Sequence, residues 1–468
     1  MKTKLLDILV VGSGLSSLSF IDSYLKKKKF LNVISFDNLN KIKISNFNQH
    51  IFKFLPPQME GKENKVNEYF FLNKIKCDKN CNIFGSLEFG GLSNYWGLQI
   101  DANITKDINH LKKKTKKDIQ ECFMEILQKF KLIGEFKINQ KLHNNKLIKN
   151  SFFNEDLYQK DKDIIIEKPI LGYKRNNNQK YLTTKDEKKS KLIPTFLYKN
   201  LSSKKKIIFH NYFVEKIQDF KNNLLLTCSN GKKKKYFYTK KLVLGCGTIV
   251  SLRLIMDYLK ISKEIKIYHH PRLFSLYFLI RKWKNKMNFK PSDLHLKLKK
   301  DPTLFTSDFR PGNTKIIDAL LKFNLFLKPF KYLLYYLKEY FVFSNMFLNS
   351  KYANLYIKKK DNFFEIYSKR KNLKKIFKKN SKLIYNFLIK TKKILPFFIN
   401  YFPGYGSDFH YFGTVPMRGK GLLSTNEKCQ LKKNKKIYLI DGSVFNFKTN
   451  KYPLGLIMAN SRRIGKQI

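Results

Sequence analysis

Residues 5–20 have the sequence LLDILVVGSGLSSLSF, and this stretch decides the fold. Its first part, Leu5–Val11, is the apolar run of a buried parallel strand. The glycines that follow predict a turn, and residues 15–25 predict a helix that ends at a run of lysines. A second short strand is expected at 32–36. The start of the chain therefore predicts a strand, a helix and a parallel strand in succession.

The turn has the pattern Gly12-x-Gly14-x-x-Ser17. The first glycine allows the tight turn, and the second lets the backbone approach a pyrophosphate at the helix N-terminus, where N–H groups and the helix dipole favour anions. Ser17 replaces the usual third glycine and is small enough for close helix packing. Asp37 follows the second strand, where a carboxylate binds ribose hydroxyls. The pattern predicts dinucleotide binding, with NAD and FAD both open; the alternative is an ordinary turn between strand and helix.

Three later motifs also carry chemistry. They are the glycine-rich GGLSNYWG at 90–97, DFHYFGT at 408–414, and DGSVF at 441–445, which precedes Pro453 and an expected closing helix at 454–465. Each has a plain structural alternative: an ordinary loop, a structural histidine and a tight turn.

Longer segments predict the rest of the architecture. Strand alternation at 206–238 predicts a meander, and 352–367 predicts a hairpin. The segments 320–347 and 373–398 have the texture of helices. With 468 residues, the chain is expected to form two closely joined domains.

The four motifs together resemble the glucose–methanol–choline (GMC) oxidoreductases, and most of all the bacterial members that carry GGxSNxWG. The resemblance is specific at 1–100, 206–260 and 405–468, and faint between about 270 and 400. It implies an α/β fold, in which a Rossmann-like FAD-binding domain is interleaved with an α+β substrate domain built on an antiparallel sheet. The expected division is 1–105, 206–265 and 405–468 for the three parts of the FAD domain, 106–205 for a mixed helical insertion, and 266–404 for the substrate or cap domain.

The resemblance also implies which residues hold FAD. The ADP half would be held by Gly12, Gly14, Ser17 and Asp37, by the backbone of Val214 at the adenine, and by the segment ending at Gly247. The flavin would be lined by Gly91, Ser93, Asn94, Trp96 and Gly97. The pyrophosphate and the flavin edge would be approached by Asp441 and Gly442, and the pyrimidine end by Pro453 and Leu454.

His410 matches the catalytic histidine of the family. The implied reaction moves a hydride from a CH–OH carbon to flavin N5, and a neutral imidazole, with a pKa near ~6.5, can accept the hydroxyl proton. We expect the other seven histidines to be structural: His50, His110, His143, His210, His269, His270 and His295.

The second catalytic residue of the family, a His or Asn, is replaced here by Tyr452, next to Pro453. Three alternatives stay open: Tyr452 takes the hydrogen-bonding role, Asn450 reaches in through a shifted loop, or catalysis is altered. A Tyr hydroxyl, with a pKa near ~10, is a poor base.

The net charge of +59 is extreme, but lysine is abundant in every segment. This indicates an AT-rich coding composition, although such a surface attracts anions of any kind. No zinc-finger spacing or RNP pattern accompanies it, so no specific nucleic-acid partner is expected. The alternative function is a degenerate flavoprotein that binds membranes or polyanions, with 325–330 and 332–336 lying on an anionic bilayer rather than packing in a core.

The six cysteines lack metal-ligand spacing, so we expect reduced thiols and no metal site. The charged, glycine-interrupted N-terminus is not a signal peptide pattern. These features predict a cytoplasmic protein, with peripheral contact to the inner face of the membrane as an option. The expected substrate is a small alcohol or a sugar. The sequence leaves open whether oxygen, a quinone or a protein accepts the electrons.

Overall fold

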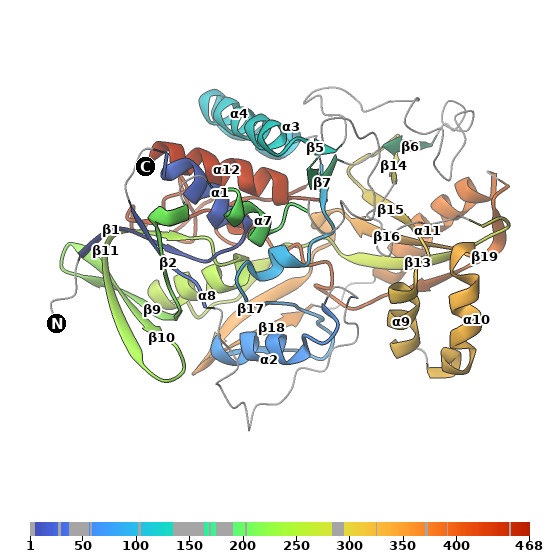
Figure 1. Ribbon diagram of the computed structural model, residues 1–468, viewed down its shortest axis with the longest axis horizontal. Helices are drawn as coiled ribbons and strands as arrows, with labels where there is room; N and C mark the ends of the chain where they lie inside the picture. The colour runs from blue at the N-terminus through green and yellow to red at the C-terminus, as the bar shows by residue number, and fades with distance from the viewer. Residues whose placement is uncertain are drawn as a thin grey trace.

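A computed structural model describes residues 5–26, 30–36, 56, 59–101, 104–133, 163–167, 170–174, 191–201, 204–282, 294–323, 325–369, 373–390, 392–448 and 451–468. Two units lie side by side along the long axis of the molecule (Figure 1). The first contains both described ends of the chain, and the second is built from the middle of the sequence.

The first unit is a seven-stranded sheet. Its strand order is β8 (Ile207–His210), β2 (Leu31–Ile34), β1 (Leu5–Val11), β11 (Lys234–Leu244), β10 (Asn223–Ser229) and β9 (Phe213–Phe220), with β20 (Ile437–Leu439) also pairing with β11. The strands from β8 to β11 and β20 run parallel, whereas β9, β10 and β11 form an antiparallel meander. The predicted strand–helix–strand start and the predicted meander are confirmed.

Three helices accompany this sheet: α1 (Leu15–Tyr24), α8 (Thr248–Tyr258) and α12 (Leu454–Gln467). Small side chains let α1 and α12 pack closely. Ser19 and Ser23 of α1 donate hydrogen bonds to the carbonyls of Met458 and Arg462, each at 2.8 Å. A Cβ on Gly465 would lie 2.2 Å from Ser23 Oγ. The last helix is therefore held against the first, although the two are separated by most of the chain.

The second unit is a six-stranded antiparallel sheet. Its order is β19 (Ile394–Tyr401), β13 (Arg272–Leu279), β16 (Phe341–Leu348), β15 (Phe305–Pro311), β14 (Leu294–Leu298) and β6 (Ile164–Glu167). One face shares an apolar cluster with α11 (Leu373–Lys390). The other face shares a smaller cluster with α9 (Thr314–Phe323).

Smaller elements complete the structure. Two further sheets are formed by β12 (Ile265–Ile267), β17 (Leu355–Lys360), β18 (Phe363–Ser368) and β3 (Ile75–Cys77), and by β4 (Gln99–Ile100), β7 (Ile170–Lys174) and β5 (Leu132–Ile133). The remaining α-helices are α2 (Glu63–Leu72), α3 (Thr105–Ile108), α4 (Lys113–Phe130), α7 (Pro194–Lys199) and α10 (Lys331–Tyr336). The 3₁₀ helices are η2 (Gly91–Asn94), η4 (Lys204–Lys206), η5 (Leu325–Phe330), η6 (Leu337–Tyr340), η7 (Ser350–Tyr352) and η8 (Gly442–Val444).

The hairpin predicted at 352–367 is confirmed as β17 and β18, but two helix predictions are wrong in part. The segment 320–347 is helical only to η6, because its last residues form β16, where all eight side chains are buried in the sheet. The segment 373–398 is helical in α11 and then enters β19. This strand contains Pro396 and lies at the sheet edge, where a proline interrupts no central ladder. Short apolar aromatic runs fit either structure, so periodicity did not separate them.

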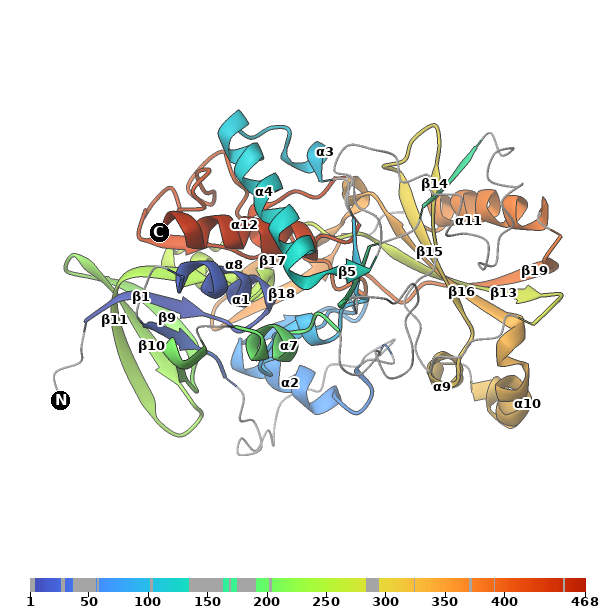
Figure 2. The same cartoon turned by 45° about the horizontal axis from the view of Figure 1, so that its top comes forward.

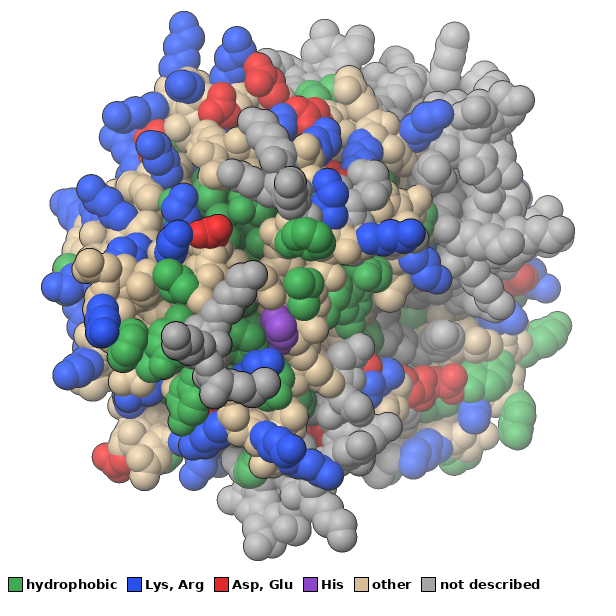
Figure 3. All heavy atoms as spheres, turned by 60° about the vertical axis from the view of Figure 1, so that its left-hand side comes forward, with side chains coloured by type: hydrophobic (Ala, Val, Ile, Leu, Met, Phe, Trp, Pro, Cys, Tyr) green, Lys and Arg blue, Asp and Glu red, His purple; other side chains and the backbone are tan. Residues whose placement is uncertain are grey.

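Basic side chains are dispersed over the surface. In the described part of the face in Figure 3, Lys and Arg are spread widely with fewer Asp or Glu between them, while apolar side chains gather toward its middle. Within the described residues, no helix is both long enough and apolar enough to span a bilayer.

Candidate active site

A cavity of about 630 Å³ is lined by both units. It brings together fourteen of the residues singled out in the sequence: Gly12, Gly14, Gly91, Ser93, Trp96, Gly97, Val214, Gly247, His410, Asp441, Gly442, Tyr452, Pro453 and Leu454. Ser17 and Asn94 lie behind the cavity wall and support it. Asp37 and Asn450 lie outside the described residues.

The cavity floor is formed where the ends of β1 and β11 meet. Gly12 has φ +110°, and a Cβ there would lie 2.5 Å from the carbonyl oxygen of Gly245. Ser17 is fully buried and donates a hydrogen bond to the same carbonyl at 3.1 Å. Ser17 therefore ties α1 to the end of β11. Because Gly12 and Gly245 have no side chains, their backbone is exposed to the cavity.

The glycine-rich loop is fastened to the first turn of α1. The backbone N–H of Leu15 donates to Ser93 Oγ at 3.1 Å, and the N–H of Gly90 donates to Ser13 Oγ at 2.9 Å. Asn94 Nδ2 closes the loop on itself by donating to the Phe89 carbonyl at 2.8 Å. Two motifs that are far apart in the sequence therefore form one continuous wall.

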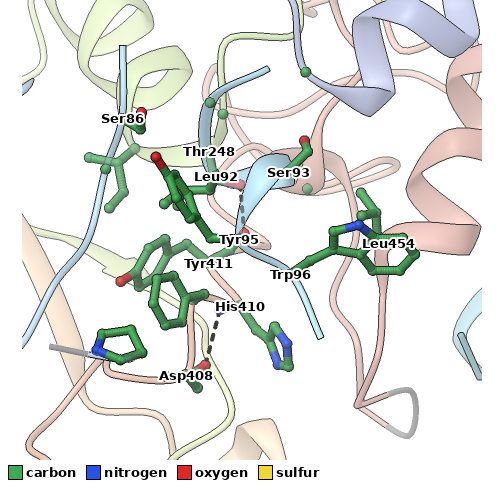
Figure 4. A pocket seen from close by; sticks show the side chains of 18 of the residues that line it. Ser86, Leu92, Ser93, Tyr95, Trp96, Thr248, Asp408, His410, Tyr411 and Leu454 are labelled. Carbon is green, nitrogen blue, oxygen red and sulfur yellow. Dashed lines mark hydrogen bonds between the residues drawn. The ribbon is translucent and has the colours of Figure 1, made fainter. Parts of the chain in front are cut away.

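The indole of Trp96 forms the next part of the wall. Its Nε1 donates to the Leu192 carbonyl at 3.0 Å, and a Cβ on Gly172 would lie 2.8 Å from the ring. Figure 4 shows Trp96, Leu454 and His410 projecting into the same space. Trp96 therefore contributes a flat apolar surface to the cavity wall.

Asp441 organises the C-terminal motif. Its carboxylate accepts hydrogen bonds from the Ser443 N–H at 3.0 Å, the Ser443 hydroxyl at 2.6 Å and the Ser251 hydroxyl at 2.6 Å. Burial raises the pKa of this carboxyl. A Cβ on the adjacent Gly442 would lie 2.8 Å from the Tyr411 carbonyl oxygen, so backbone segments touch at this point. Asp441 thus joins α8 to the turn that follows β20.

Val214 lines the cavity from β9, in the sheet of the first unit. Its carbonyl accepts a hydrogen bond from Arg253 Nη2 at 2.8 Å, and the Glu215 carbonyl accepts one from Arg253 Nη1 at 3.1 Å. Arg253 therefore fixes the backbone at the position predicted to meet the adenine.

His410 is half-buried and lines the cavity. Burial lowers its pKa to about 4. Its Nδ1 lies 3.4 Å from His270 Nδ1, and its ring packs 5.2 Å from the Phe347 ring, measured between centroids. The imidazole is consequently neutral at physiological pH.

The hydrogen-bond partners of His270 define the tautomer of His410. His270 Nε2 lies 3.1 Å from the Phe447 carbonyl, which can only accept, so this nitrogen carries the proton. A neutral His270 then accepts at Nδ1, and His410 donates from Nδ1. The remaining nitrogen of His410, Nε2, is left with its lone pair. His270, expected from the sequence to be structural, thus orients the candidate base.

Asp408 holds these histidines in place. Its Oδ2 accepts the backbone N–H groups of His270 at 2.9 Å and His410 at 3.3 Å, while its Oδ1 lies 2.9 Å from His269 Nδ1. Burial by itself would raise the pKa of Asp408, but its interactions with His269, His410 and the His270 N–H together outweigh burial, and the net pKa lies below its usual value. Phe409, between Asp408 and His410 in the sequence, has φ +65°, a strained conformation for a non-glycine residue.

Tyr452 also lies in the cavity wall. Its ring stacks on His295 with centroids 4.5 Å apart and faces the His410 ring edge-on at 6.4 Å. Of the two candidates for the second catalytic residue, Tyr452 thus has its side chain beside His410. Asn450 is outside the described residues.

The sequence analysis missed the polar residues of the second unit's sheet that line the cavity. Asp308 accepts hydrogen bonds from Asn345 Nδ2 at 2.7 Å, Gln99 Nε2 at 3.1 Å and Arg310 Nη2 at 3.1 Å. Arg272 lines the same wall, and burial lowers its pKa to about 10. One signal was available: Asp308 and Arg310 are opposite charges two residues apart, which would share one face of a strand, and buried charged residues are almost always paired.

No cluster of His, Cys, Asp or Glu suited to a metal ion occurs among the residues that the structure describes. All six cysteines are free thiols.

Known proteins resemble this chain in structure rather than in sequence. No protein-family model matches it, and the search of curated proteins found no match. Among solved structures, pyridoxine 4-oxidase from Mesorbium loti matches with a TM-score of 0.60 and 11% sequence identity, over 99% of both chains. This full-length likeness shows the fold: a Rossmann-like unit joined to a substrate domain, as the sequence predicted.

Proposed function

We propose that the protein is an FAD-dependent oxidoreductase of the GMC type that oxidises a CH–OH group. The observation that carries this proposal is the single cavity lined by the Gly12–Gly14 turn, the glycine-rich loop, the Asp441–Gly442 turn and His410. The structural neighbour is an oxidase by name, which supports an oxidoreductase.

The residues present fit FAD. Gly12 and Gly245 leave backbone without side chains at the N-terminus of α1, where a pyrophosphate would be favoured. Gly91, Ser93 and Trp96 would lie along the flavin, and Val214 would lie at the adenine. A cavity of this volume is within the range of cofactor sites.

When bound, the flavin would accept a hydride at N5. His410 would act as the base, because its Nε2 has the free lone pair in the tautomer set by His270 and the Phe447 carbonyl. Phe347 and Tyr452 pack around His410 and limit access of water. Asp408 holds the backbone of both histidines, so the base is positioned before the substrate arrives.

The decisive experiment is reconstitution with FAD. The purified protein is expected to be yellow, or to become yellow with added FAD, and its flavin spectrum should bleach anaerobically on addition of a substrate. A screen of sugars, sugar nucleotides and simple alcohols follows flavin reduction and does not require the acceptor to be known. Colourless protein that fails to bind added FAD would remove the proposal.

The substrate proposed from the family resemblance is a sugar or a sugar-linked intermediate. Arg272 in the cavity wall supports substrates with an anionic group, since guanidinium groups recognise carboxylates and phosphates, whereas Arg310 already donates to Asp308. The screen therefore pairs each neutral alcohol with a carboxylated or phosphorylated analogue. Oxygen, a quinone or a redox protein are then compared as acceptors by the rate of flavin reoxidation.

The rate of flavin reduction is expected to be flat between about pH 6 and 8. His410 has a pKa of about 4 in the folded protein, so it remains the unprotonated base throughout this range, and the rate falls only as pH approaches 4. An ordinary histidine would instead lose activity below its pKa of ~6.5. Stopped-flow reduction across this range distinguishes the two, and an inflection near pH 6.5 would contradict the assignment.

The control for this profile is folding itself. The unfolded imidazole binds its proton near pH ~6.5, before the folded one does. The unfolded state therefore gains stability as pH falls from that value toward 4. Circular dichroism at each pH must show folded protein before a loss of rate is assigned to His410.

A non-catalytic flavoprotein that serves as a membrane or polyanion partner is the second candidate. The observation in its favour is the exposed aromatic surface of α10 and η5, which can bind a membrane whether or not the cavity is active. Substrate-dependent flavin bleaching separates the two candidates.

A further inference from the structure

The helical projection formed by α9, η5 and α10 exposes large apolar side chains. Figure 1 and Figure 2 both show α9 and α10 projecting below the sheet of the second unit. Phe326 is 89% exposed, Tyr332 82% and Tyr336 74%, and Phe330 and Leu333 are exposed by about half. We call these five residues the aromatic tip. Exposed apolar residues that gather in this way mark an interaction site rather than ordinary surface.

The aromatic tip is a supported surface and not a poorly packed core. Behind it, Ile317 and Leu321 of α9 are buried against Leu276 and Phe343 of the sheet. The Tyr335 hydroxyl donates to Asp318 and joins α10 to α9. The aromatic tip therefore lies outside the apolar cluster that α9 and the sheet form.

The charges around the aromatic tip are mainly positive. Lys328 and Lys331 are exposed within it, and Lys282 Nζ lies 5.8 Å from the centroid of the Tyr336 ring. Lys338 lies beside Glu339 in η6. The other described acids nearby are Asp318, which accepts a hydrogen bond from Tyr335, and Glu60, whose charge acts on the same tyrosine. Exposed aromatic residues interleaved with lysines suit the interface of an anionic bilayer, because the rings enter the headgroup region while the ammonium groups meet lipid phosphates. A second copy fits poorly, since each chain carries a net charge of +59.

The aromatic tip is also adjacent to the cavity. Ile316 of α9 and Leu327 of η5 line it, together with Leu276 and Phe343 of the sheet. Contact of the aromatic tip with a bilayer would therefore place the part of the cavity that Ile316 and Leu327 line near the lipid.

We propose that the aromatic tip is a docking surface for anionic phospholipid bilayers. Docking depends on the surface of the second unit alone, so it does not require the proposed redox activity. The anionic lipid supplies the phosphates that the lysines bind, and its acyl boundary receives the rings.

The test is co-sedimentation of the full chain with vesicles of phosphatidylcholine alone or mixed with phosphatidylglycerol. The wild type is expected to bind the mixed vesicles, with affinity that falls as salt is raised. A triple variant, Phe326→Ser, Tyr332→Ser and Tyr336→Ser, is expected to bind about tenfold more weakly or worse. It loses the apolar area that would enter the bilayer, while it keeps every lysine.

The matched control is Tyr236→Ser. Tyr236 is 48% exposed and lies on β11 beside Lys234 and Lys235, so it tests an exposed aromatic residue within another basic surface. This variant is expected to bind like the wild type. Equal unfolding midpoints for all three proteins show that the substitutions act on the surface and not on the fold.

Three results would overturn the proposal. The first is unchanged binding by the triple variant, which would assign the attraction to charge alone. The second is equal binding to both kinds of vesicle. The third is a wild type that is dimeric by light scattering and becomes monomeric in the triple variant, which would make the aromatic tip an interface between copies.

Discussion

Replacing His410 by alanine is expected to slow flavin reduction by about 10²–10⁴-fold, while FAD binding and folding are kept. The imidazole lines the cavity, and its Nε2 is the nitrogen left to accept a proton once His270 and the Phe447 carbonyl have fixed the tautomer. Alanine removes this acceptor without a charge change, because the pKa of about 4 keeps His410 neutral at pH 7. Stopped-flow reduction with the substrate found by screening measures the effect.

The control is His110→Ala, since His110 is exposed in the turn after α3 and lies outside the cavity wall. It should reduce its flavin at the wild-type rate. FAD affinity, measured by fluorescence quenching, should be alike in all three proteins. If His410→Ala reduces flavin as fast as the wild type, His410 is not the base and Tyr452 becomes the next residue to test.

The local sequence pattern was sufficient to predict the fold of the first unit, because its characteristic residues lie in short segments. The Gly12–Gly14 turn lies between a buried strand and a helix, and its glycine spacing marks the boundary of both. The second unit was less predictable. Its central strand β16 is buried on both faces, so its apolar run carries no alternation and resembles a buried helix.

The missed site residues have a common physical origin. Arg272 lies on β13 and Arg310 on β15, on either side of β16, so they reach one cavity wall only through strand pairing across the sheet. His270, two residues before β13 begins, contacts His410 behind that wall. Pairing between strands that are distant in the sequence produces no characteristic spacing of residues that could be recognised in the sequence. The step His269-His270-Pro271 was visible, but nothing local indicates that His270 would lie beside a residue 140 positions later.

Replacing Gly12 by alanine is expected to destabilise the protein by about 3–5 kcal/mol and to abolish FAD binding. Two costs act together. A residue with a Cβ is strained at φ +110°, and the new carbon would lie 2.5 Å from the carbonyl oxygen and 2.8 Å from the carbonyl carbon of Gly245. Both are backbone atoms at the paired ends of β1 and β11, so they cannot rotate away. Urea unfolding measures the loss, and FAD titration measures the site.

Gly61→Ala is the matched control, because Gly61 also has positive φ, +72°, but a Cβ there meets no atom within 4 Å. It should cost only about 1 kcal/mol from backbone strain and leave FAD binding intact. Equal losses in the two variants would show that the contact with Gly245 is unimportant. If Gly12→Ala is insoluble, the junction can be tested from its other side. Gly245→Ala would place a Cβ 2.3 Å from Ser17 Oγ, and adding Ser17→Ala removes that oxygen, so the double variant should regain stability over Gly245→Ala alone.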